Sequence, residues 1–355
     1  MIHFFLTFSK NAADSPFGRR LTEMGVQSKI IAGEVRHRFR HRLWMVFVGR
    51  PQTAWFAIRA AVRSLVVETP QPRVVVVWTH IEALIVGLVR WLFRRTVTRI
   101  VLVGFILTRR SGWLQNTLRS AYFGLVFSVV DMAIVHSRVE AARYAELFSG
   151  RKTRFVFIPW GSHIDGLDAL AQAQPGGYAA DVLCAGRSGR DYVTLYRALA
   201  VTQHRVKIVC DLAESLNGCE PADNIEVLDR CYGAAYLREL MDARCVVIPL
   251  GVGDISAGQM VLLQAMQMGK TVVMTRTTTT VDYATDGHDA LLVEAGDAYA
   301  LRAAVDSVLA NAGLRAVLGS NAKLTFSNQF TVPGLVTSLV KEIQAMDSLA
   351  GTPPV

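Results

Sequence analysis

Short apolar runs rich in β-branched residues alternate with helical patterns along the first half of the chain. This alternation is typical of a doubly wound α/β domain, in which the strands of one parallel sheet are buried between helices on both faces. The predicted strands are HFFLTF (3–8), SKIIAG (28–33), RVVVVWTH (73–80), RIVLVGFIL (99–107), MAIVHS (132–137) and FVFIPW (155–160).

The second half repeats the same alternation and therefore predicts a second domain of the same kind. Helical patterns again separate the strands, for example YLRELMDA before the strand that starts at Cys245. The predicted strands are DVLCAG (181–186), RVKIVCD (205–211), IEVLDR (225–230), CVVIPL (245–250) and TVVMT (271–275).

A glycine-rich loop, GVGDISAGQ (251–259), follows the strand at 245–250 and leads into a helix. The helix has an apolar stripe over residues 260–268 and stops at Gly269. A glycine loop at a helix N-terminus presents unpaired N–H groups and the positive end of a dipole, which together suit a phosphate. The alternative is an ordinary strand-to-helix turn in which glycine serves geometry alone.

Composition restricts the protein class. Half of the 355 residues are apolar, which excludes disorder. The five cysteines all fall in the second half, without a C-x-x-C pair, and favour free thiols in a reducing compartment over disulfides or a zinc site. The apolar start lacks a basic region and a small-residue cleavage site, so we expect a first strand and a cytoplasmic protein.

Charge is distributed unevenly between the two halves. Residues 1–160 carry 24 Lys and Arg against 8 Asp and Glu, and residues 161–355 carry 14 against 21, giving net charges of +16 and −7. Arginines lie beside aromatic residues in the segments 36–50 and 90–100, which favours contact with an anionic membrane surface. The alternative is that these segments are solvated basic faces of core helices.

The membrane contact is expected to be peripheral, at the inner face. No apolar run reaches the ~20 residues that a spanning helix requires. No helix-turn-helix, zinc-finger or RNA-binding signature is visible, so we expect no nucleic-acid partner.

The string S-A-G-Q-x-V-L-L-Q-A-M-x-x-G-K-x-V-V (256–273), followed by D-G-x-x-A-L-L-V (286–293), resembles a known family. It is similar to the nucleotide-sugar half of GT-B glycosyltransferases, in particular the retaining family 4, also called glycosyltransferase group 1. The resemblance implies two Rossmann-like domains facing across a cleft and a nucleotide-sugar donor. The family places two glutamates where this chain has Ser256 and Gln264.

The resemblance also implies a set of donor-binding residues. Gln264 can hydrogen-bond a ribose hydroxyl, and Arg187 and Arg190, in the turn after the strand at 181–186, match positions that hold the donor diphosphate. The alternative for two surface arginines is simple solvation. The expected contacts besides these arginines are Gly186, Ser256, Ala257, Gly258, Gln259 and Gln264.

On the acceptor side, polar residues at strand ends are the candidates, because ligands of open α/β sheets bind there. The histidine that the family often carries after the fourth strand is absent, and His80 is the expected substitute, against the alternative of a structural histidine. Ser137 is expected to start a helix in a capping box with Glu140. The further candidates are Glu82, 108–110 and His136.

Domain limits follow from the resemblance and from a linker with Pro-Gly-Gly at 175–177. We expect an N-terminal domain over 1–165 that faces acceptor and membrane, and a nucleotide-sugar domain over 178–328. The segment 329–355 is expected to cross back to the first domain, as in many GT-B proteins.

The resulting prediction is a metal-independent hexosyltransferase-like enzyme without a cofactor, retaining as its family is. It moves a sugar to a lipid-linked or polysaccharide-precursor acceptor at the cytoplasmic membrane face. Two alternatives stay open. One is a catalytically silent GT-B scaffold in a polysaccharide assembly complex, and the other is a UDP-sugar epimerase.

Overall fold

The computed structural model of the chain divides into two compact units. The first comprises Met1–Ile158 with the C-terminal segment from Leu335, and the second is Pro159–Gly334. The predicted limits were 1–165, 178–328 and 329–355, so the second unit begins before its predicted start and ends after its predicted end. The structure describes residues 1–350 except 7–11, 34–49, 96, 108–111, 169–178, 212 and 254–255.

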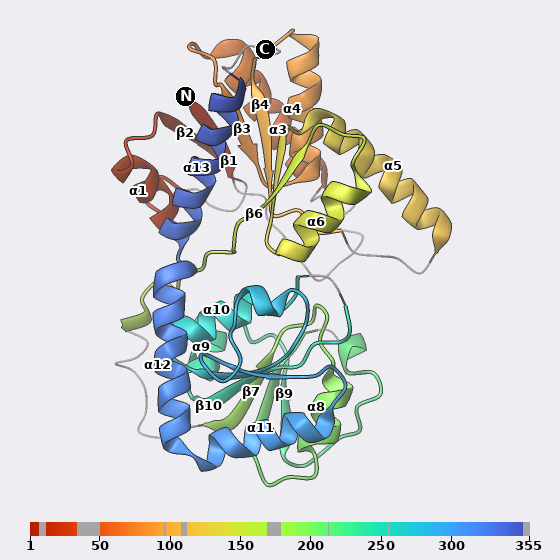
Figure 1. The fold of residues 1–355 in the computed structure, drawn as a ribbon, viewed down its shortest axis with the longest axis vertical. Coiled ribbons are helices and arrows are strands. Elements are labelled where there is room, and N and C mark those ends of the chain that lie inside the picture. Colours follow the sequence, from red (N-terminus) through yellow and green to blue (C-terminus); the bar gives the residue numbers. More distant parts are fainter. Residues whose placement is uncertain are drawn as a thin grey trace. The chain divides into compact units, whose positions relative to one another are not determined.

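A six-stranded parallel sheet forms the centre of the first unit, in the order β2-β1-β3-β4-β5-β6 (Figure 1). Its strands coincide with the six predicted apolar runs. They are β1 (Ile2–Leu6), β2 (Ser28–Ala32), β3 (Val74–Val77), β4 (Arg99–Val103), β5 (Met132–Val135) and β6 (Arg154–Phe157). The helices are α1 (Pro16–Glu23), α3 (Arg50–Val62) with a π-helical turn (Arg63–Val67), α4 (His80–Leu92), α5 (Trp113–Val129), α6 (Arg138–Leu147) and α13 (Val332–Ala350).

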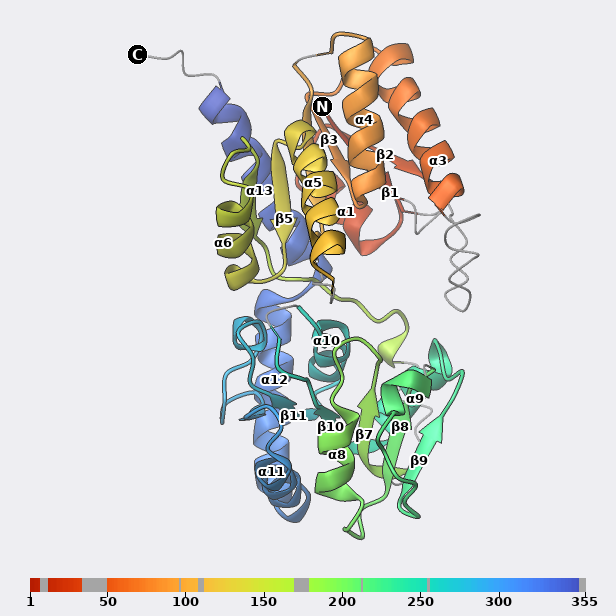
Figure 2. The same cartoon turned by 90° about the vertical axis from the view of Figure 1, so that its right-hand side faces the viewer.

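Helices cover both faces of this sheet, as the continuous valines of β3 require, because all four are fully buried. Side chains of α3, α4, α5 and α6 pack on the face of Val75 and Val77. Helices α1 and α13 lie against the other face, where Phe4 meets Phe17 edge to face (Figure 2). Gly87 lets α4 approach α5, since a Cβ there would lie 2.7 Å from Cβ of Val129.

The second unit also has a six-stranded parallel sheet, in the order β12-β11-β10-β7-β8-β9. The five predicted strands are all present, and β12 adds a sixth. The strands are β7 (Ala180–Ala185), β8 (Val206–Val209), β9 (Ile225–Leu228), β10 (Ala243–Ile248), β11 (Thr271–Thr275) and β12 (Leu291–Val293). The helices are α8 (Tyr192–Leu199), α9 (Ala234–Met241), α10 (Gln259–Gln267), α11 (Ala298–Ala310) and α12 (Ala312–Gln329), with 3₁₀ turns at Ala213–Leu216 and Thr280–Asp282.

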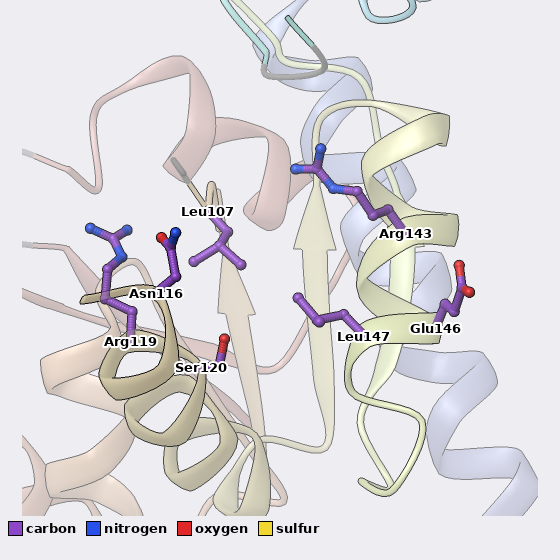
Figure 3. Close-up of a pocket in the computed structure, with 7 residues that line it drawn as sticks. All are labelled: Leu107, Asn116, Arg119, Ser120, Arg143, Glu146 and Leu147. Atoms are coloured by element: carbon purple, nitrogen blue, oxygen red, sulfur yellow. The ribbon is translucent and has the colours of Figure 1, made fainter. Parts of the chain in front are cut away.

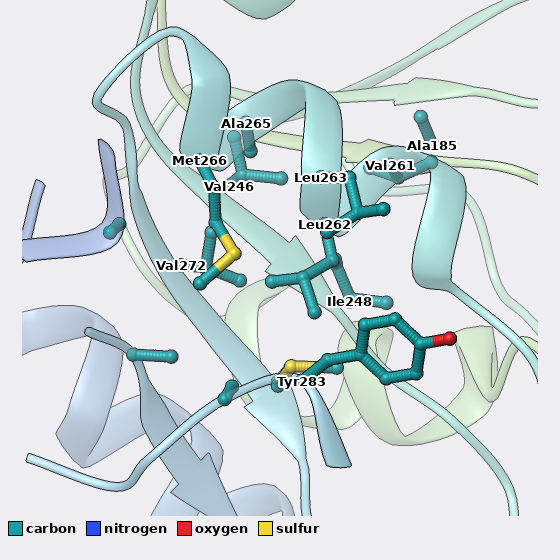
Figure 4. Close-up of a cluster of buried hydrophobic side chains, with 14 of the residues drawn as sticks. Ala185, Val246, Ile248, Val261, Leu262, Leu263, Ala265, Met266, Val272 and Tyr283 are labelled. Carbon is teal, nitrogen blue, oxygen red and sulfur yellow. The ribbon is translucent and has the colours of Figure 1, made fainter. Parts of the chain in front are cut away.

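The core of the second unit is built around α10. Figure 4 shows Leu262 and Met266 of this helix pointing toward Ile248 and Val272 of the sheet, and all four side chains are buried. Helix α12 closes over the end of α10 through a glycine, because a Cβ at Gly319 would lie 2.2 Å from a backbone oxygen. The predicted apolar stripe of this helix is therefore its core face.

Strand order differs between the units although both are parallel. In the second unit β7 is flanked by β8 on one side and by β10 on the other. The chain therefore winds outward in both directions from the adjacent strands β7 and β10. In the first unit β1 pairs with β2 on one side and with β3 on the other, so the strand order reverses between β1 and β3. Such reversals are where open α/β sheets bind ligands, beyond the carboxyl ends of the strands.

Candidate functional site

Two turns meet at the reversal point of the second sheet. One, at 186–191, follows β7, and the other, at 249–258, follows β10. They are joined by backbone hydrogen bonds: the Gly251 N–H donates to the Gly189 oxygen over 3.1 Å, and the Asp191 N–H donates to the Pro249 oxygen over 3.0 Å. The structure therefore brings together the two segments that the sequence marked as donor-binding.

Glycine is required at two positions of these turns. Gly186 has φ +104°, and a Cβ there would lie 2.6 Å from a guanidinium nitrogen of Arg190. Gly258 has φ +87° and would place a Cβ 3.0 Å from Cγ2 of Ile248. Side chains disfavour both backbone conformations, so the turns keep their shape only with glycine.

The start of α10 is open. Its N-cap residue is Gly258, which supplies no side-chain hydrogen bond to the first turn. Met260, in that first turn, is about half exposed. N–H groups at such a helix start, together with the helix dipole, attract an anion. The predicted contacts Ala257 and Gln259 stand on either side of this cap, both half-buried.

Arg190 braces its own turn. Its Nε donates to the Ala185 oxygen over 2.8 Å and its Nη1 to the Ser188 oxygen over 3.1 Å. The guanidinium thus holds the end of β7 and the turn together beneath Gly186. Its positive charge stays at the turn, while its role toward a diphosphate remains a prediction.

Arg187 is held from the neighbouring strand. Its Nη1 lies 3.4 Å from an oxygen of Asp211, which follows β8, and the Tyr232 hydroxyl donates to the same oxygen over 2.8 Å. That hydrogen bond to a carboxylate raises the pKa of Tyr232. Neither Asp211 nor Tyr232 was predicted as a site residue, although an aspartate at the end of a predicted strand was a visible signal.

Gln264 is tied to α9. Its Oε1 accepts a hydrogen bond of 3.0 Å from the hydroxyl of Tyr236. Burial raises the pKa of Tyr236, and the positive charge of Arg190 opposes this rise. Gln264, Tyr236 and Arg190 therefore form one neighbourhood around the two turns. Tyr236 is a third site residue that was not predicted from the sequence, because it lies outside every motif.

Thr275 fixes the entrance to the loop after β10. Its hydroxyl oxygen accepts from the Leu250 N–H over 2.8 Å, and both residues are buried. The following threonines bond one another within their own turn, for example Thr277 with Thr280. The threonine-rich loop is thus a packed turn beside the site.

His80 lies in the first unit, at the first position of α4. Its Nδ1 is 2.6 Å from the Tyr122 hydroxyl, and its ring meets Tyr122 and Phe123 edge to face. These contacts fix the ring and are what a structural histidine makes, so an acceptor role for His80 stays a prediction. The candidates at 108–110 lie outside the described residues.

Glu82 is fully buried two residues further along α4. One carboxylate oxygen accepts from the Trp78 and Thr79 N–H groups over 3.0 and 2.9 Å, in a capping box with Thr79. The other oxygen has no hydrogen-bond partner among the described residues. Burial raises the pKa of Glu82 to about 7, against the opposing effect of its hydrogen bonds.

The predicted capping box of Ser137 and Glu140 is wrong. Ser137 is the N-cap residue of α6, but its buried hydroxyl makes no cap hydrogen bond. Glu140 is fully buried and accepts instead from the Tyr144 hydroxyl over 3.3 Å. The neighbouring His136 Nδ1–H donates to the Ile158 oxygen over 2.8 Å, and burial lowers the pKa of this histidine to about 4.

All five cysteines are free thiols, in agreement with the sequence analysis. Over the described residues, no three His, Cys, Asp or Glu side chains are grouped to hold a metal ion. Within the same residues, no helix is long and apolar enough to cross a membrane.

The segment 180–311 matches the family described as glycosyl transferases group 1. No curated protein sequence matches this chain. The resemblance drawn from the sequence motifs is therefore confirmed over the second unit, where the two turns lie.

Solved structures resemble the whole chain. Sucrose-phosphate synthase from Thermosynechococcus elongatus matches with a TM-score of 0.70 at 16% identity, over 98% of this chain and 99% of that one. The α,α-trehalose 6-phosphate synthase from Burkholderia multivorans matches with 0.67 at 11%, over 99% of both chains. HepE from Anabaena, in complex with UDP-glucose, matches with 0.61 at 14%, over 97% of this chain and all of that one. These similarities confirm the GT-B fold, and with the family match they support glycosyltransferase activity.

Proposed function

We propose that this chain, a GT-B protein with a group 1 glycosyl transferase segment, moves a sugar from a nucleotide-sugar donor to a lipid-linked or polysaccharide-precursor acceptor. The protein would work while bound peripherally to the cytoplasmic face of a membrane. The observation that carries the proposal is the meeting of two glycine turns at the reversal point of the second sheet, with Arg187 and Arg190 on one turn and an open helix start on the other.

The donor would lie across these two turns. The diphosphate would contact Arg187 and the N–H groups of Gly186 and of residues 256–259. The ribose would meet Gln264, whose amide keeps hydrogen-bonding capacity beside Tyr236. The UDP and UDP-glucose complexes of HepE, which shares this fold, support a uridine nucleotide as the first donor to test.

Catalysis would rest on the leaving group. As the bond between the sugar carbon and the diphosphate oxygen breaks, negative charge grows on the diphosphate, and a new bond forms to an acceptor hydroxyl that loses its proton. Guanidinium groups and helix-start N–H groups already in place stabilise that charge most when it is largest. Arg187 is held in position by Asp211. A retaining, metal-independent outcome follows the family, and His80 is the proposed polar contact on the acceptor side.

Membrane contact is proposed for the first unit. Its helices expose large apolar side chains beside arginines, a combination that suits the headgroup region. Trp91 and Trp113 are 74% and 78% exposed. The other strongly exposed apolar residues of these helices are Trp55, Leu88, Leu92, Leu118 and Leu125. The basic segment 36–50 lies outside the described side chains and stays part of the prediction.

A silent scaffold is the second candidate, and one observation favours it. Neither Ser256 nor Gln264 supplies the carboxylate that the family has at these places. A scaffold of this kind would keep the fold and the membrane surface without turnover. An epimerase would share the donor site but would have little use for a basic, aromatic surface.

Isothermal titration calorimetry with UDP, UDP-glucose, GDP and ADP tests the donor site. We expect one nucleotide to bind and Arg187→Ala to weaken it by about 10- to 100-fold, the effect of losing a charged hydrogen bond to phosphate. Arg302→Ala is the matched control. This exposed arginine lies on α11, outside the two turns, and its Nε is 3.6 Å from an oxygen of Asp306. If no nucleotide binds to the folded protein, the donor proposal is wrong.

Turnover separates the candidates. Transfer of labelled sugar to membrane lipids would support the transferase, and conversion of the donor without transfer would support the epimerase. Nucleotide binding without either reaction would support the scaffold.

A further inference from the structure

A pocket of about 510 Å³ lies between α5 and α6 in the first unit (Figure 3). Asn116, Arg119 and Ser120 line it from α5, and Arg143 and Leu147 line it from α6. The pocket belongs to the first unit alone and contains none of the predicted donor residues.

Residue spacing explains why the pocket exists. Asn116, Ser120 and Gly124 follow one another at four-residue intervals and therefore share one face of α5. Their short side chains leave room opposite Leu147. At the far end, Arg151 closes in, because its Nη2 lies 3.3 Å from the position that a Cβ at Gly124 would take.

Two guanidinium groups flank the space. Arg143 lies 5.2 Å from the ring centre of Tyr144 and donates from Nη2 to its hydroxyl over 3.4 Å. Arg119 lies 5.8 Å from the ring centre of Phe123. A guanidinium carries several N–H donors in one plane, so an arginine that rests on an aromatic face can also donate to a ligand. These N–H groups suit the oxygens of a phosphate.

The one acidic residue of the lining does not oppose this charge directly. In Figure 3 the Arg143 guanidinium and the Leu147 side chain point from α6 toward α5, whereas the Glu146 carboxylate lies on the other side of α6. The two guanidinium groups and the one carboxylate give the lining a net charge of +1.

Hydrocarbon surface borders the charged groups. Leu107 and Leu147 form apolar parts of the lining. Trp113 lies seven residues before Ser120, shares its face of α5, and is 78% exposed. A ligand that fits both features has a phosphate attached to hydrocarbon, as a lipid has.

We propose that this pocket binds the phosphate of an anionic lipid, with Arg119 and Arg143 as its ligands and the exposed Trp113 side chain at the hydrocarbon boundary. The lipid part of the proposal rests on the proposed membrane attachment and names the residues that give it specificity. A soluble phosphate ester shares the same chemistry, so the experiment separates the two sources.

Vesicle flotation tests the lipid source. The full chain is mixed with vesicles of phosphatidylcholine alone or with added phosphatidylglycerol. We expect flotation only with the anionic vesicles, and we expect Arg119→Gln with Arg143→Gln to weaken it about tenfold more than the control pair. The control is Arg19→Gln with Arg73→Gln, two exposed arginines of the first unit outside the pocket that remove the same charge.

Calorimetry with glycerol phosphate and inorganic phosphate tests the soluble source. Binding that the pocket variant abolishes and the control keeps would support a phosphate site, with or without a lipid. Ser120→Glu is a second variant, which adds a negative charge at an exposed position without removing a contact; we expect it to weaken binding in the same way.

The outcomes separate the proposals. Equal losses in the pocket and control variants would overturn the pocket site and leave membrane attachment standing. If the wild type neither floats nor binds a soluble phosphate, the pocket proposal is wrong. Nucleotide affinity, which belongs to the second unit, is expected to be unchanged in every variant, so a failure of the donor proposal appears separately.

Discussion

The two units use the same parallel architecture but differ at particular strand ends. In the second unit the strands that flank the reversal point end in glycine turns, and α10 begins without a side-chain cap. In the first unit the ends of β3 and β5 carry buried polar side chains, and Glu82, Ser137 and Glu140 are fully buried there.

The difference concerns the N–H groups in the first turn of a helix and the side chains that accept hydrogen bonds from them. In the first unit Thr79 and Glu82 satisfy the first turn of α4 internally, so that helix start is closed to a ligand. In the second unit the first turn of α10 receives no hydrogen bond from the side chain of its N-cap residue, Gly258. A helix start without a side-chain cap, beside arginines, suits the binding of an anion. A capped helix start adds to the stability of the fold. Four predictions test this contrast.

Glu82→Gln is expected to have the largest effect, as a change in the pH dependence of stability. The pKa of Glu82 is raised to about 7 in the folded protein. The stability that the protonated Glu82 contributes to the unfolding free energy is therefore fully present below pH ~4.5 and is lost as pH rises through 7. Glutamine keeps the acceptor but does not titrate. The stability of wild type relative to the variant should therefore fall by about 3 kcal/mol between pH 4 and 8.

Tryptophan fluorescence during urea unfolding measures this difference, because five of the six tryptophans precede residue 158. His3 and His136 have pKa values lowered to about 4 and act in the opposite direction. They are the same in both proteins and cancel in the comparison. A pH-independent difference would show that the pKa of Glu82 is the same in the folded and the unfolded protein.

Gly258→Ala tests the open helix start of the second unit. Its positive φ and the nearby Ile248 disfavour a side chain, so we expect a loss of about 1–2 kcal/mol in unfolding free energy and weaker nucleotide binding. Gly251→Ala in the same loop is the control, since nothing lies within 4 Å of its Cβ position. Equal effects of the two substitutions on urea unfolding would contradict the argument.

Thr79→Ala and Ser137→Ala compare two caps of identical sequence spacing. Thr79 accepts from the Glu82 N–H over 3.2 Å, whereas the Ser137 hydroxyl has no partner in the described structure. We expect Thr79→Ala to cost about 1 kcal/mol and Ser137→Ala to cost about zero. Denaturation midpoints of the two variants decide it, and a larger loss for Ser137→Ala would reverse the assignment.

Asp211→Asn is expected to have the smallest effect. The pair with Arg187 is partly exposed, so its interaction is screened by solvent. Removing the carboxylate charge beside the proposed diphosphate should tighten nucleotide binding by up to about threefold, while the amide still accepts from Tyr232. Titration calorimetry that instead finds binding tenfold weaker would show that the charge of Asp211 is needed to orient Arg187.

The fold could be predicted because strands and helices follow local hydrophobic patterns. The valines of β3 and the apolar stripe of α10 needed no tertiary information. The glycine turns were visible for the same reason, since Gly186 and Gly258 stand where strand gives way to helix.

The partners of the site residues could not be predicted, because they depend on strand order. Asp211 reaches Arg187 only because β8 lies beside β7, and Tyr236 reaches Gln264 only through the packing of α9. The prediction of the capping box at Ser137 was wrong for a related reason. Ser137 and Thr79 have the same spacing to a glutamate, but Glu140 accepts from the Tyr144 hydroxyl, a partner that sequence spacing does not reveal.

The chain passes between its two units twice, at Ile158–Pro159 and at Gly334–Leu335. Beside these crossings the two segments are fastened together, since the Ser162 N–H donates to the Phe330 oxygen over 2.9 Å. A single proteolytic cut at one crossing would leave the two units joined by the chain segment at the other crossing. A truncation after Ile158 would strip α13 from its sheet, so an isolated first unit needs α13 re-attached by a permuted or fused gene.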